Sequence, residues 1–431
     1  MRKMKDSGVE WIDTIPENWK VVPMKALFSF GKGLPITKDN LTDAGIPVIS
    51  YGQIHARWNS GVTTHKDLFR FVDAFYLETN AQSLVKKGDF IMADTSEDRE
   101  GCGNCAYIDT DDVIFAGYHT IILHSLSQSE NKYLAYLFLT DSWRSQIRKV
   151  VSGVKLFSVS RRILGSCSVI VPDNASEIVK FLDKQCAGVN ALISNVQAQI
   201  EKLKAYKQSL ITEVVTKGLD PNVPMKDSGV EWIGEIPKCW NMVRGKALFE
   251  ECDARSDDGS EELLTVSQYT GVTPRSQKSV NMFESTTLEG YKICEVGDIA
   301  ANTMWLWAGA IGVSEYRGVI SPSYNVYRQK EIKYISSYLD CLLRIPLLVQ
   351  EYASRSTGIR ASRLRLYPKD FMDIMFPVPP IEEQKTIMDI LGKKIDMVNQ
   401  MISIKQSKIE KLELYKRSLI YEYVTGKKEV S

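Results

Sequence analysis

The feature that most constrains how this chain can fold is a segment that occurs twice. Met4–Pro16 reads MKDSGVEWIDTIP and Met225–Pro237 reads MKDSGVEWIGEIP, and the two copies differ at only two positions. A second repeat relates Ile200–Lys217 to Ile409–Gly426, with 12 of 18 residues identical. The offsets are 221 and 209 residues, so the segments between the repeats differ in length, and they share little sequence. We call Met4–Pro16 and Met225–Pro237 the two frames, and the dissimilar segments that follow them the two inserts. One repeated scaffold that carries two different inserts predicts a protein that recognises two different targets.

Two long segments carry apolar residues at heptad spacing, which is typical of coiled-coil helices. The two seam positions of the first segment hold Val179, Cys186, Ile193, Ile200, Lys207 and Val214, and Leu182, Val189, Val196, Leu203 and Leu210. The seams of the second hold Met388, Ile395, Ile402, Ile409, Lys416 and Tyr423, and Leu391, Val398, Lys405, Leu412 and Leu419. A long helix cannot bury such a stripe alone, so we expect helices 177–217 and 382–426 to pack as an antiparallel coiled coil. The alternative is two unrelated amphipathic helices, each on its own domain.

The order of the repeats predicts a circular arrangement. After the first helix the chain passes through the linker Leu219–Pro224 into the second copy of the frame. No frame follows the second helix, but the matching copy stands at Met4. We therefore expect residues 4–16 to lie near the end of the second helix, in an internal pseudo-twofold repeat.

The expected fold class is α+β, with two globular α/β domains joined by the helix pair. The expected segments are 1–16 as the first frame, 17–175 as the first insert domain, 176–218 as the central helix, 219–237 as the linker and second frame, 238–380 as the second insert domain, and 381–427 as the C-terminal helix. Within the first insert, 133–151 is expected to be helical.

Composition indicates a folded protein of the cytoplasm. The chain has 431 residues, of which 44% are hydrophobic and 25% are charged. The N-terminus does not resemble a signal peptide, and no apolar run is long enough to span a membrane. Eight scattered cysteines favour free thiols in a reducing compartment. A net charge of +1 argues against coating nucleic acid through bulk charge, although it leaves room for a local basic surface.

No catalytic motif stands out. The chain contains no phosphate-binding loop, no dinucleotide fingerprint, no methyltransferase motif and no nucleophile elbow. All four histidines (His55, His65, His119 and His124) lie in the first insert, so no histidine site is duplicated with the frame. Cys102 and Cys105 form a single CxxC that His119 and His124 could complete as a zinc site, but small residues at a tight turn explain it better. We therefore expect no metal and no cofactor.

Two clusters of basic residues are more informative, because they stand at equivalent places before the two helices and contain no acid. The first cluster contains Arg144, Arg148, Lys149, Lys155, Arg161 and Arg162, and the second contains Arg355, Arg360, Arg363 and Arg365. Such residues suit contacts with phosphates, and arginine can also read guanine edges. The alternative is a solvated basic face.

Three polar and aromatic stretches are further candidates for contact with bases. The first, within 51–58, offers Gln53, His55 and Arg57, the second offers Gln268 and Tyr269, and the third is Thr303–Trp307 (TMWLW). The alternative, that these side chains belong to the hydrophobic core, is stronger here than for the basic clusters, because Trp and Tyr are more often core residues than contact residues.

Together these residues resemble the specificity subunit of type I restriction–modification systems. The resemblance rests on the duplicated DSGVEWIG-x-IP frame, the entry Val378–Gln384 to the second helix, and the segments Tyr206–Ile211 and Tyr415–Ile420. Gly88-Asp89 and Gly297-Asp298 are also typical of that family. The first helix departs from the pattern, because it opens with Val-Pro-Asp-Asn-Ala-Ser-Glu.

The resemblance implies two target-recognition domains, each of which reads one half of a split double-stranded DNA sequence. It also implies that the helix pair measures the gap and docks two modification subunits, which the restriction subunits then join. Methyl transfer and cleavage would belong to those partners, so the chain itself is expected not to be an enzyme. The alternatives are a free-standing DNA-binding regulator and a protein-binding scaffold.

Overall fold

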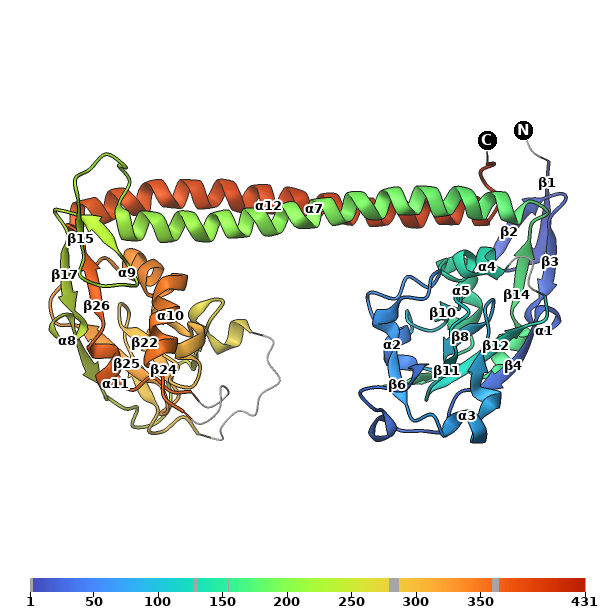
Figure 1. Ribbon diagram of the computed structural model, residues 1–431, viewed down its shortest axis with the longest axis horizontal. Coiled ribbons are helices and arrows are strands. Elements are labelled where there is room, and N and C mark those ends of the chain that lie inside the picture. Colours follow the sequence, from blue (N-terminus) through green and yellow to red (C-terminus); the bar gives the residue numbers. More distant parts are fainter. Residues whose placement is uncertain (1–2, 128–130, 154, 279–286, 359–363, 431) are drawn as a thin grey trace. The chain divides into compact units, whose positions relative to one another are not determined.

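Both copies of the repeated frame are β-hairpins with the same register. The computed structural model describes residues 3–127, 131–153, 155–278, 287–358 and 364–430 (Figure 1). In the first hairpin Met4 pairs with Pro16, and in the second Met225 pairs with Pro237. The turns match as well, because Asp6 accepts a hydrogen bond from the backbone of Gly8 (2.8 Å) and Asp227 accepts one from Gly229 (2.9 Å). Both glycines have positive φ, a conformation that glycine adopts without strain.

The chain divides into two compact units, Met1–Val196 with Ser407–Ser431, and Gln197–Gln406. Each unit therefore contains one frame, one insert and a part of each long helix. This division agrees with the circular order of the repeats. No helix in the described residues is both long and apolar enough to cross a membrane.

The first unit contains a helix layer, a central sheet and a second sheet. The strands are β1 (Met4–Val9), β2 (Ile12–Pro16), β3 (Lys20–Pro23), β4 (Phe28–Lys32), β5 (Ile46–Ile49), β6 (Arg70–Val72), β7 (Leu84–Val85), β8 (Phe90–Ala93), β9 (Thr95–Ser96), β10 (Cys105–Tyr107), β11 (Ile114–Ala116), β12 (Thr120–Ser125), β13 (Phe157–Ser158) and β14 (Ser168–Val171). The helices of the insert are α1 (Met24–Leu27), α2 (Tyr51–Ile54), α3 (Tyr76–Thr79), α4 (Asn131–Phe138), α5 (Asp141–Arg148) and α6 (Arg161–Ser166), with short 3₁₀ turns at Lys38–Asn40, Lys66–Leu68 and Ala81–Ser83.

The central sheet of the first unit has the order β10-β8-β12-β4, and both of its faces are buried. Phe90 and Met92 belong to the core that α4 and α5 cover, whereas Ile91 and Ala93 pack with residues of the second sheet, β6-β5-β11-β7. This alternation follows from the two-residue period of a strand, which points successive side chains to opposite faces.

The second unit repeats the helix layer and the central sheet of this plan, whereas two two-stranded sheets stand in place of the second four-stranded sheet. Its strands are β15 (Met225–Asp227), β16 (Glu235–Pro237), β17 (Asn241–Arg244), β18 (Phe249–Cys252), β19 (Leu264–Ser267), β20 (Gly271–Pro274), β21 (Lys292–Cys294), β22 (Ile299–Ala301), β23 (Ile311–Val313), β24 (Gly318–Ile320), β25 (Asn325–Gln329) and β26 (Met375–Val378). Its helices are α8 (Gly245–Leu248), α9 (Ser336–Leu343), α10 (Pro346–Arg355) and α11 (Pro368–Met372), with 3₁₀ turns at Arg275–Gln277 and Leu306–Ala308. The order β18-β25-β22-β23 corresponds to β4-β12-β8-β10 of the first unit.

One expected helix is two helices. The segment 133–151 was expected to be continuous, but α4 ends at Phe138 and α5 begins at Asp141. Thr140 caps α5, because its side chain accepts a hydrogen bond from the backbone of Trp143. The second unit has the same break between α9 and α10, where Pro346 stands at the first position of the new helix.

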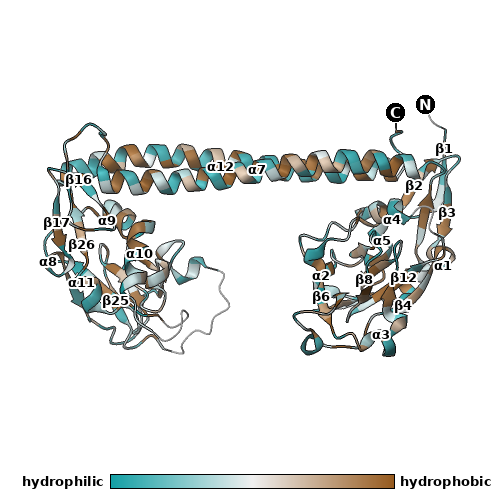
Figure 2. Cartoon of the chain, viewed as in Figure 1, coloured by the Kyte–Doolittle hydropathy of each residue, from teal (hydrophilic) through white to brown (hydrophobic). Residues whose placement is uncertain are grey.

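The long helices α7 (Ala175–Lys217) and α12 (Ile381–Val424) run antiparallel within each unit, as predicted. In the first unit the ring of Phe181 packs on Tyr423 (4.4 Å between centroids), and Lys416 donates to Asn190 (2.9 Å). In the second unit Lys207 donates to Asn399 at 3.0 Å. Figure 2 shows the hydrophobic residues that recur along both helices, separated by hydrophilic ones.

Each frame lies at the end of a long helix, also as predicted. In the first unit a Cβ added at Gly426, just after α12, would lie 2.5 Å from Pro16, and in the second a Cβ at Gly218, just after α7, would lie 3.8 Å from the equivalent Pro237. Tyr133 donates to the Val424 carbonyl and Tyr338 donates to the Val215 carbonyl, both at 2.7 Å. In each unit the insert is therefore hydrogen-bonded to the end of the long helix that also contacts the frame of that unit.

Candidate nucleic-acid interface

The first basic cluster shares a surface with a loop far away in sequence. The strand β13, which follows Lys155, pairs antiparallel with β9, so that Phe157 lies opposite Ser96. The backbone N–H of Val159 also donates to the Asp94 carbonyl at 2.7 Å. Asp94 begins the connection between β8 and β10, which we call the first-unit loop (residues 94–104). The basic segment and this loop therefore form one continuous surface.

Three basic side chains of this cluster are exposed on that surface. Lys155 precedes β13, and Arg161 and Arg162 open α6. Within the described ranges none of the three forms an ion pair. Ser160 fixes the start of α6 by accepting a hydrogen bond from the backbone of Ile163. These side chains have the exposure and the free charge that phosphate contacts require.

The other three basic residues of the cluster are held by protein groups. Arg148 pairs with Asp141 (2.8 Å) and donates to the Glu100 carbonyl (2.6 Å). Lys149 forms an ion pair with Glu10. Arg144 donates to the Phe138 carbonyl at 2.7 Å, and burial lowers the pKa of its guanidinium.

The cluster contains no acidic residue, but this did not show that its basic side chains are unpaired. Their acidic partners lie outside the cluster. Asp141 stands just before the cluster, and Glu10 belongs to the distant frame.

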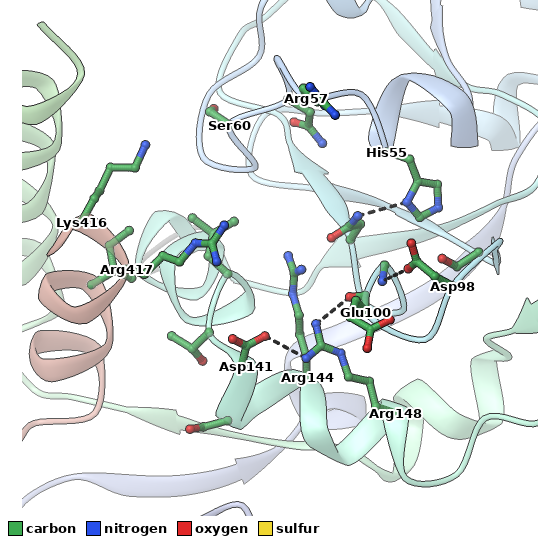
Figure 3. Close-up of a pocket in the computed structure, with 18 of the residues that line it drawn as sticks. His55, Arg57, Ser60, Asp98, Glu100, Asp141, Arg144, Arg148, Lys416 and Arg417 are labelled. Atoms are coloured by element: carbon green, nitrogen blue, oxygen red, sulfur yellow. Dashed lines mark hydrogen bonds and ion pairs between the residues drawn. The ribbon is translucent and has the colours of Figure 1, made fainter. Parts of the chain in front are cut away.

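A pocket of about 1330 Å³ opens beside this surface, wholly within the first unit (Figure 3). Four predicted residues line it: His55, Arg57, Arg144 and Arg148. Arg417 and Lys416 reach it from α12, and Arg417 is close enough to contribute to the lowered pKa of Arg144, of which burial is the main cause. The acidic residues on its wall are Glu97, Asp98, Glu100 and Asp141. The pocket thus has mixed charge, with arginines contributed by both the insert and the long helix.

Two residues of the stretch 51–58 have structural partners. The Gln53 side chain accepts a hydrogen bond from the backbone of Ser50 (3.2 Å) and so caps α2. One ring nitrogen of His55 lies 2.9 Å from the Thr95 carbonyl and the other lies 3.0 Å from the Asn104 amide, so this ring fixes the first-unit loop. Arg57 is exposed at the pocket and remains the better candidate for contact with DNA.

His119 was considered only for the disfavoured zinc site, and the structure places it on the same surface as the first-unit loop. Among the described residues it is the one that has positive φ (55°) without being a glycine. Its ring lies 3.4 Å from Asp94 and packs edge-on against Tyr51. Nothing in the sequence signals this backbone conformation, because residues other than glycine adopt it uncommonly.

The CxxC does not assemble with histidines. His124 lies 2.9 Å from Asp89, whereas His119 lies 3.4 Å from Asp94. Cys102 and Cys105 are buried, and burial raises the pKa of Cys105 to about 12, so its thiol stays protonated at neutral pH. No group of three or more metal-ligating side chains occurs in the part of the chain that the structure describes. Gly103, at φ 95°, makes the tight turn that was the preferred explanation.

The predicted residues of the second unit are less completely placed. Arg365 is exposed, and its backbone pairs with Thr357. Arg355 is bound to Glu351 at 2.6 Å, whereas Arg360 and Arg363 lie outside the described residues. Gln268 and Tyr269 form the exposed turn between β19 and β20. Arg344 holds this turn by donating to the Tyr269 carbonyl at 2.7 Å.

The Gly-Asp pairs are structural. Asp89 accepts hydrogen bonds from the Lys86 and Ser125 backbones and contacts His124. Asp298 accepts two hydrogen bonds from Arg328, both at 2.7 Å. Each aspartate therefore joins the start of one central strand to its neighbour.

Comparison with known proteins identifies relatives over nearly the whole chain. A family model described as "Type I restriction modification DNA specificity domain" matches residues 16–202. Two proteins of Methanocaldococcus jannaschii are each 22% identical to the chain: a putative type I restriction enzyme MjaX specificity subunit and the type I restriction enzyme MjaVIII specificity subunit. The alignments cover 96% of this chain and 95% and 93% of those proteins.

A solved chain has the same fold. It comes from a structure described as "Structural basis underlying complex assembly and conformational transition of the type I R-M system". Its TM-score is 0.59 at 16% identity, with 96% of this chain and 99% of that chain covered.

Proposed function

We propose that each of the two units of this chain, which is similar to type I restriction–modification specificity subunits, reads one half of a bipartite DNA target. The observation that carries the proposal is the pairing of equivalent scaffolds with different surfaces. The hairpins, central sheets and tyrosine anchors correspond between units, whereas the loops beside the basic segments do not.

In this proposal, exposed basic residues hold the phosphates and neighbouring loops read base edges. Lys155, Arg161 and Arg162 serve the first unit, and Arg365 serves the second. Phosphate contacts position a protein on the duplex but carry no sequence information, so the bases must be read by other groups. The near-zero net charge implies weak binding by the chain alone and tighter binding by a complex that closes around the DNA.

We further propose that α7 and α12 set the gap between the half-sites. Helices of 43 and 44 residues, at about 1.5 Å per residue, are roughly 65 Å long. A rod of this kind fixes a distance better than a flexible linker does, because its length cannot change without breaking backbone hydrogen bonds.

Docking of two identical modification subunits is supported by a duplicated apolar surface on the helices. Leu192 and Tyr415 of the first unit are 52% and 53% exposed, and their equivalents in the second unit, Met401 and Tyr206, are 51% and 54% exposed. Large apolar side chains that are exposed at matching positions are typical of interaction sites. Two equal sites on one chain suit two copies of one partner.

The chemistry then belongs to the partners. The chain acts as the recognition subunit, while methyl transfer resides in the modification subunits and cleavage in the restriction subunits that join them. We expect this assembly in the cytoplasm, where free thiols persist and DNA is accessible. The alternative functions, a free-standing regulator or a protein scaffold, require no such partners.

The test compares genomic methylation in the host with that of a strain lacking this chain. The proposal expects one bipartite adenine-methylation motif to disappear, and expects the chain to co-purify with a methyltransferase. A methylome that does not change, together with purification free of any methyltransferase, would favour the regulator or the scaffold.

A further inference from the structure

The two units present loops of opposite chemistry at equivalent positions. The first-unit loop (94–104) joins β8 to β10, and the second-unit loop (302–310) joins β22 to β23. Both are closed by the same backbone hydrogen bond, from Ala93 to Asn104 (3.1 Å) and from Asn302 to Ala310 (2.9 Å). The first-unit loop carries Glu97, Asp98, Arg99 and Glu100, whereas the second-unit loop has no charged residue and carries Met304, Trp305 and Trp307.

The two loops are anchored alike. Asp94 lies 3.4 Å from His119, and at the equivalent position Thr303 donates a hydrogen bond to the Ser323 carbonyl. A glycine near the end of each loop packs on the equivalent helix, and a Cβ added at Gly309 would lie 3.0 Å from Val349 of α10. That helix leads into the basic segment that contains Arg365. The second-unit loop thus occupies the place that the first-unit loop occupies on the candidate DNA surface.

Trp305 is exposed on a rigid support. Half of its surface is accessible, and its ring stacks on Trp307 with 5.7 Å between centroids. The indole N–H of Trp307 donates to the Met304 carbonyl (3.0 Å), and the Asn302 side chain accepts from the Met304 backbone (3.2 Å). Leu306, between the two tryptophans, is fully buried in the core. The loop therefore holds its indole in place before any ligand arrives.

We propose, on the basis of the proposed function, that Trp305 and Met304 are specificity-determining residues that contact bases of the second half-site through apolar and stacking interactions. Indole rings stack on exposed bases, apolar side chains contact the thymine methyl group, and apolar wedges open flexible base steps. The charged first-unit loop has no aromatic side chain for such stacking and is suited to polar readout. The two half-sites are thus read by different chemistry on one scaffold.

The experiment measures DNA binding by the complex of this chain with its modification subunits. The probe is a duplex carrying the motif methylated in the host, with 2-aminopurine at successive positions of the half-site that the second insert specifies. Trp305→Ala should weaken binding about 5- to 150-fold, as expected for the loss of one aromatic stack on a base. Trp305→Phe should recover part of the affinity, and the fluorescence response of one position should disappear in the alanine variant.

Ile332→Ala is the matched control, because Ile332 is an exposed apolar residue of the same unit outside the loop. Wild-type affinity of Trp305→Ala would overturn the inference. A loss of affinity caused by failed assembly, seen by analytical ultracentrifugation, would also overturn it, since Trp305 would then contact protein. If Trp305→Ala does not fold, two other measurements test whether Trp305 contacts a base. They are the DNA affinity of Trp305→Phe and the 2-aminopurine fluorescence of the wild-type complex. If the wild-type complex ignores bipartite DNA altogether, the proposed function itself fails.

Discussion

Lys207 donates a hydrogen bond to Asn399 at 3.0 Å, and the repeat reproduces this pair as Lys416 and Asn190 at 2.9 Å. Each pair joins α7 to α12, one in each unit. Polar residues at a coiled-coil seam cost stability but specify which register the helices adopt. The duplicated pair therefore fixes the antiparallel register twice.

A heptad insertion tests whether this register sets the DNA gap. Seven residues inserted after Val196 and seven after Gln406 would leave both lysine–asparagine pairs intact and restore the same helix face. The helices would lengthen by about 10 Å, which corresponds to roughly three base pairs. Sequencing of the methylated motif should show a longer gap between unchanged half-sites. An unchanged gap would assign the spacing to the partner subunits, and a five-residue insertion, which rotates the seam, serves as the disruptive control.

Gln384 should be important for the stability of the second unit. Its buried amide donates to the Lys333 and Pro379 carbonyls and accepts from the Ile335 backbone. Gln384→Ala leaves these groups unsatisfied and should lower the free energy of unfolding by about 2–4 kcal/mol. Urea denaturation measures this change. Gln208→Ala, at an exposed glutamine of α7 in the same unit, should change it by less than about 0.5 kcal/mol; similar losses in both variants would contradict the anchoring role.

The salt dependence of DNA binding should separate free from paired basic residues. For the assembled complex, Lys155→Ala and Arg161→Ala should each reduce the slope of log affinity against log salt by about 0.9, because each removes one phosphate contact. The methylated motif should stay the same, since phosphate contacts do not read sequence. Lys149→Ala is the comparison, because Glu10 already neutralises that lysine. Equal slopes in all variants would show that this cluster is solvated surface.

Alkaline pH should destabilise the second unit. Burial raises the pKa of Tyr334, Tyr338 and Tyr352 well above the usual value of about 10. In the unfolded chain these phenols ionise near pH 10, whereas in the folded protein they stay neutral. Their contribution to the free energy of unfolding is therefore complete below pH ~10 and is lost as the pH rises beyond it. Urea titrations at pH 8 and pH 11 should show the loss, and Tyr338→Phe should make it smaller. The same loss in wild type and variant would exclude Tyr338 as a source.

Much of the fold could be predicted because the repeats and the heptads are local or periodic signals. Heptad spacing predicted a first helix of 177–217 and the structure has Ala175–Lys217, since the apolar stripe and Gly218 mark its extent. The circular order of the repeats predicted that the first frame meets α12. The break at Thr140 was missed, because apolar residues continue on both sides of it and a single capping hydroxyl is a weak signal.

The candidate site was less predictable, because it depends on pairings between distant segments. The partners of Arg148 and Lys149 lie outside the cluster, in Asp141 and Glu10. Arg417 reaches the pocket only because α12 returns to the first unit. Thr303–Trp307 was a candidate from its sequence, but the sequence could not separate contact residues from core residues, because the exposure of Trp305 and the burial of Leu306 depend on how the loop folds. Which residues touch DNA stays a prediction.

The exchange of one insert tests the central claim most directly. Residues 17–175 would be replaced by the corresponding insert of a relative, with both frames and both long helices kept. Single-molecule sequencing of the host genome then reads the methylated motif. The account predicts that one half of the motif changes while the other half and the gap remain. A change in both halves, or no change in either, would contradict the claim that each unit reads its own half-site.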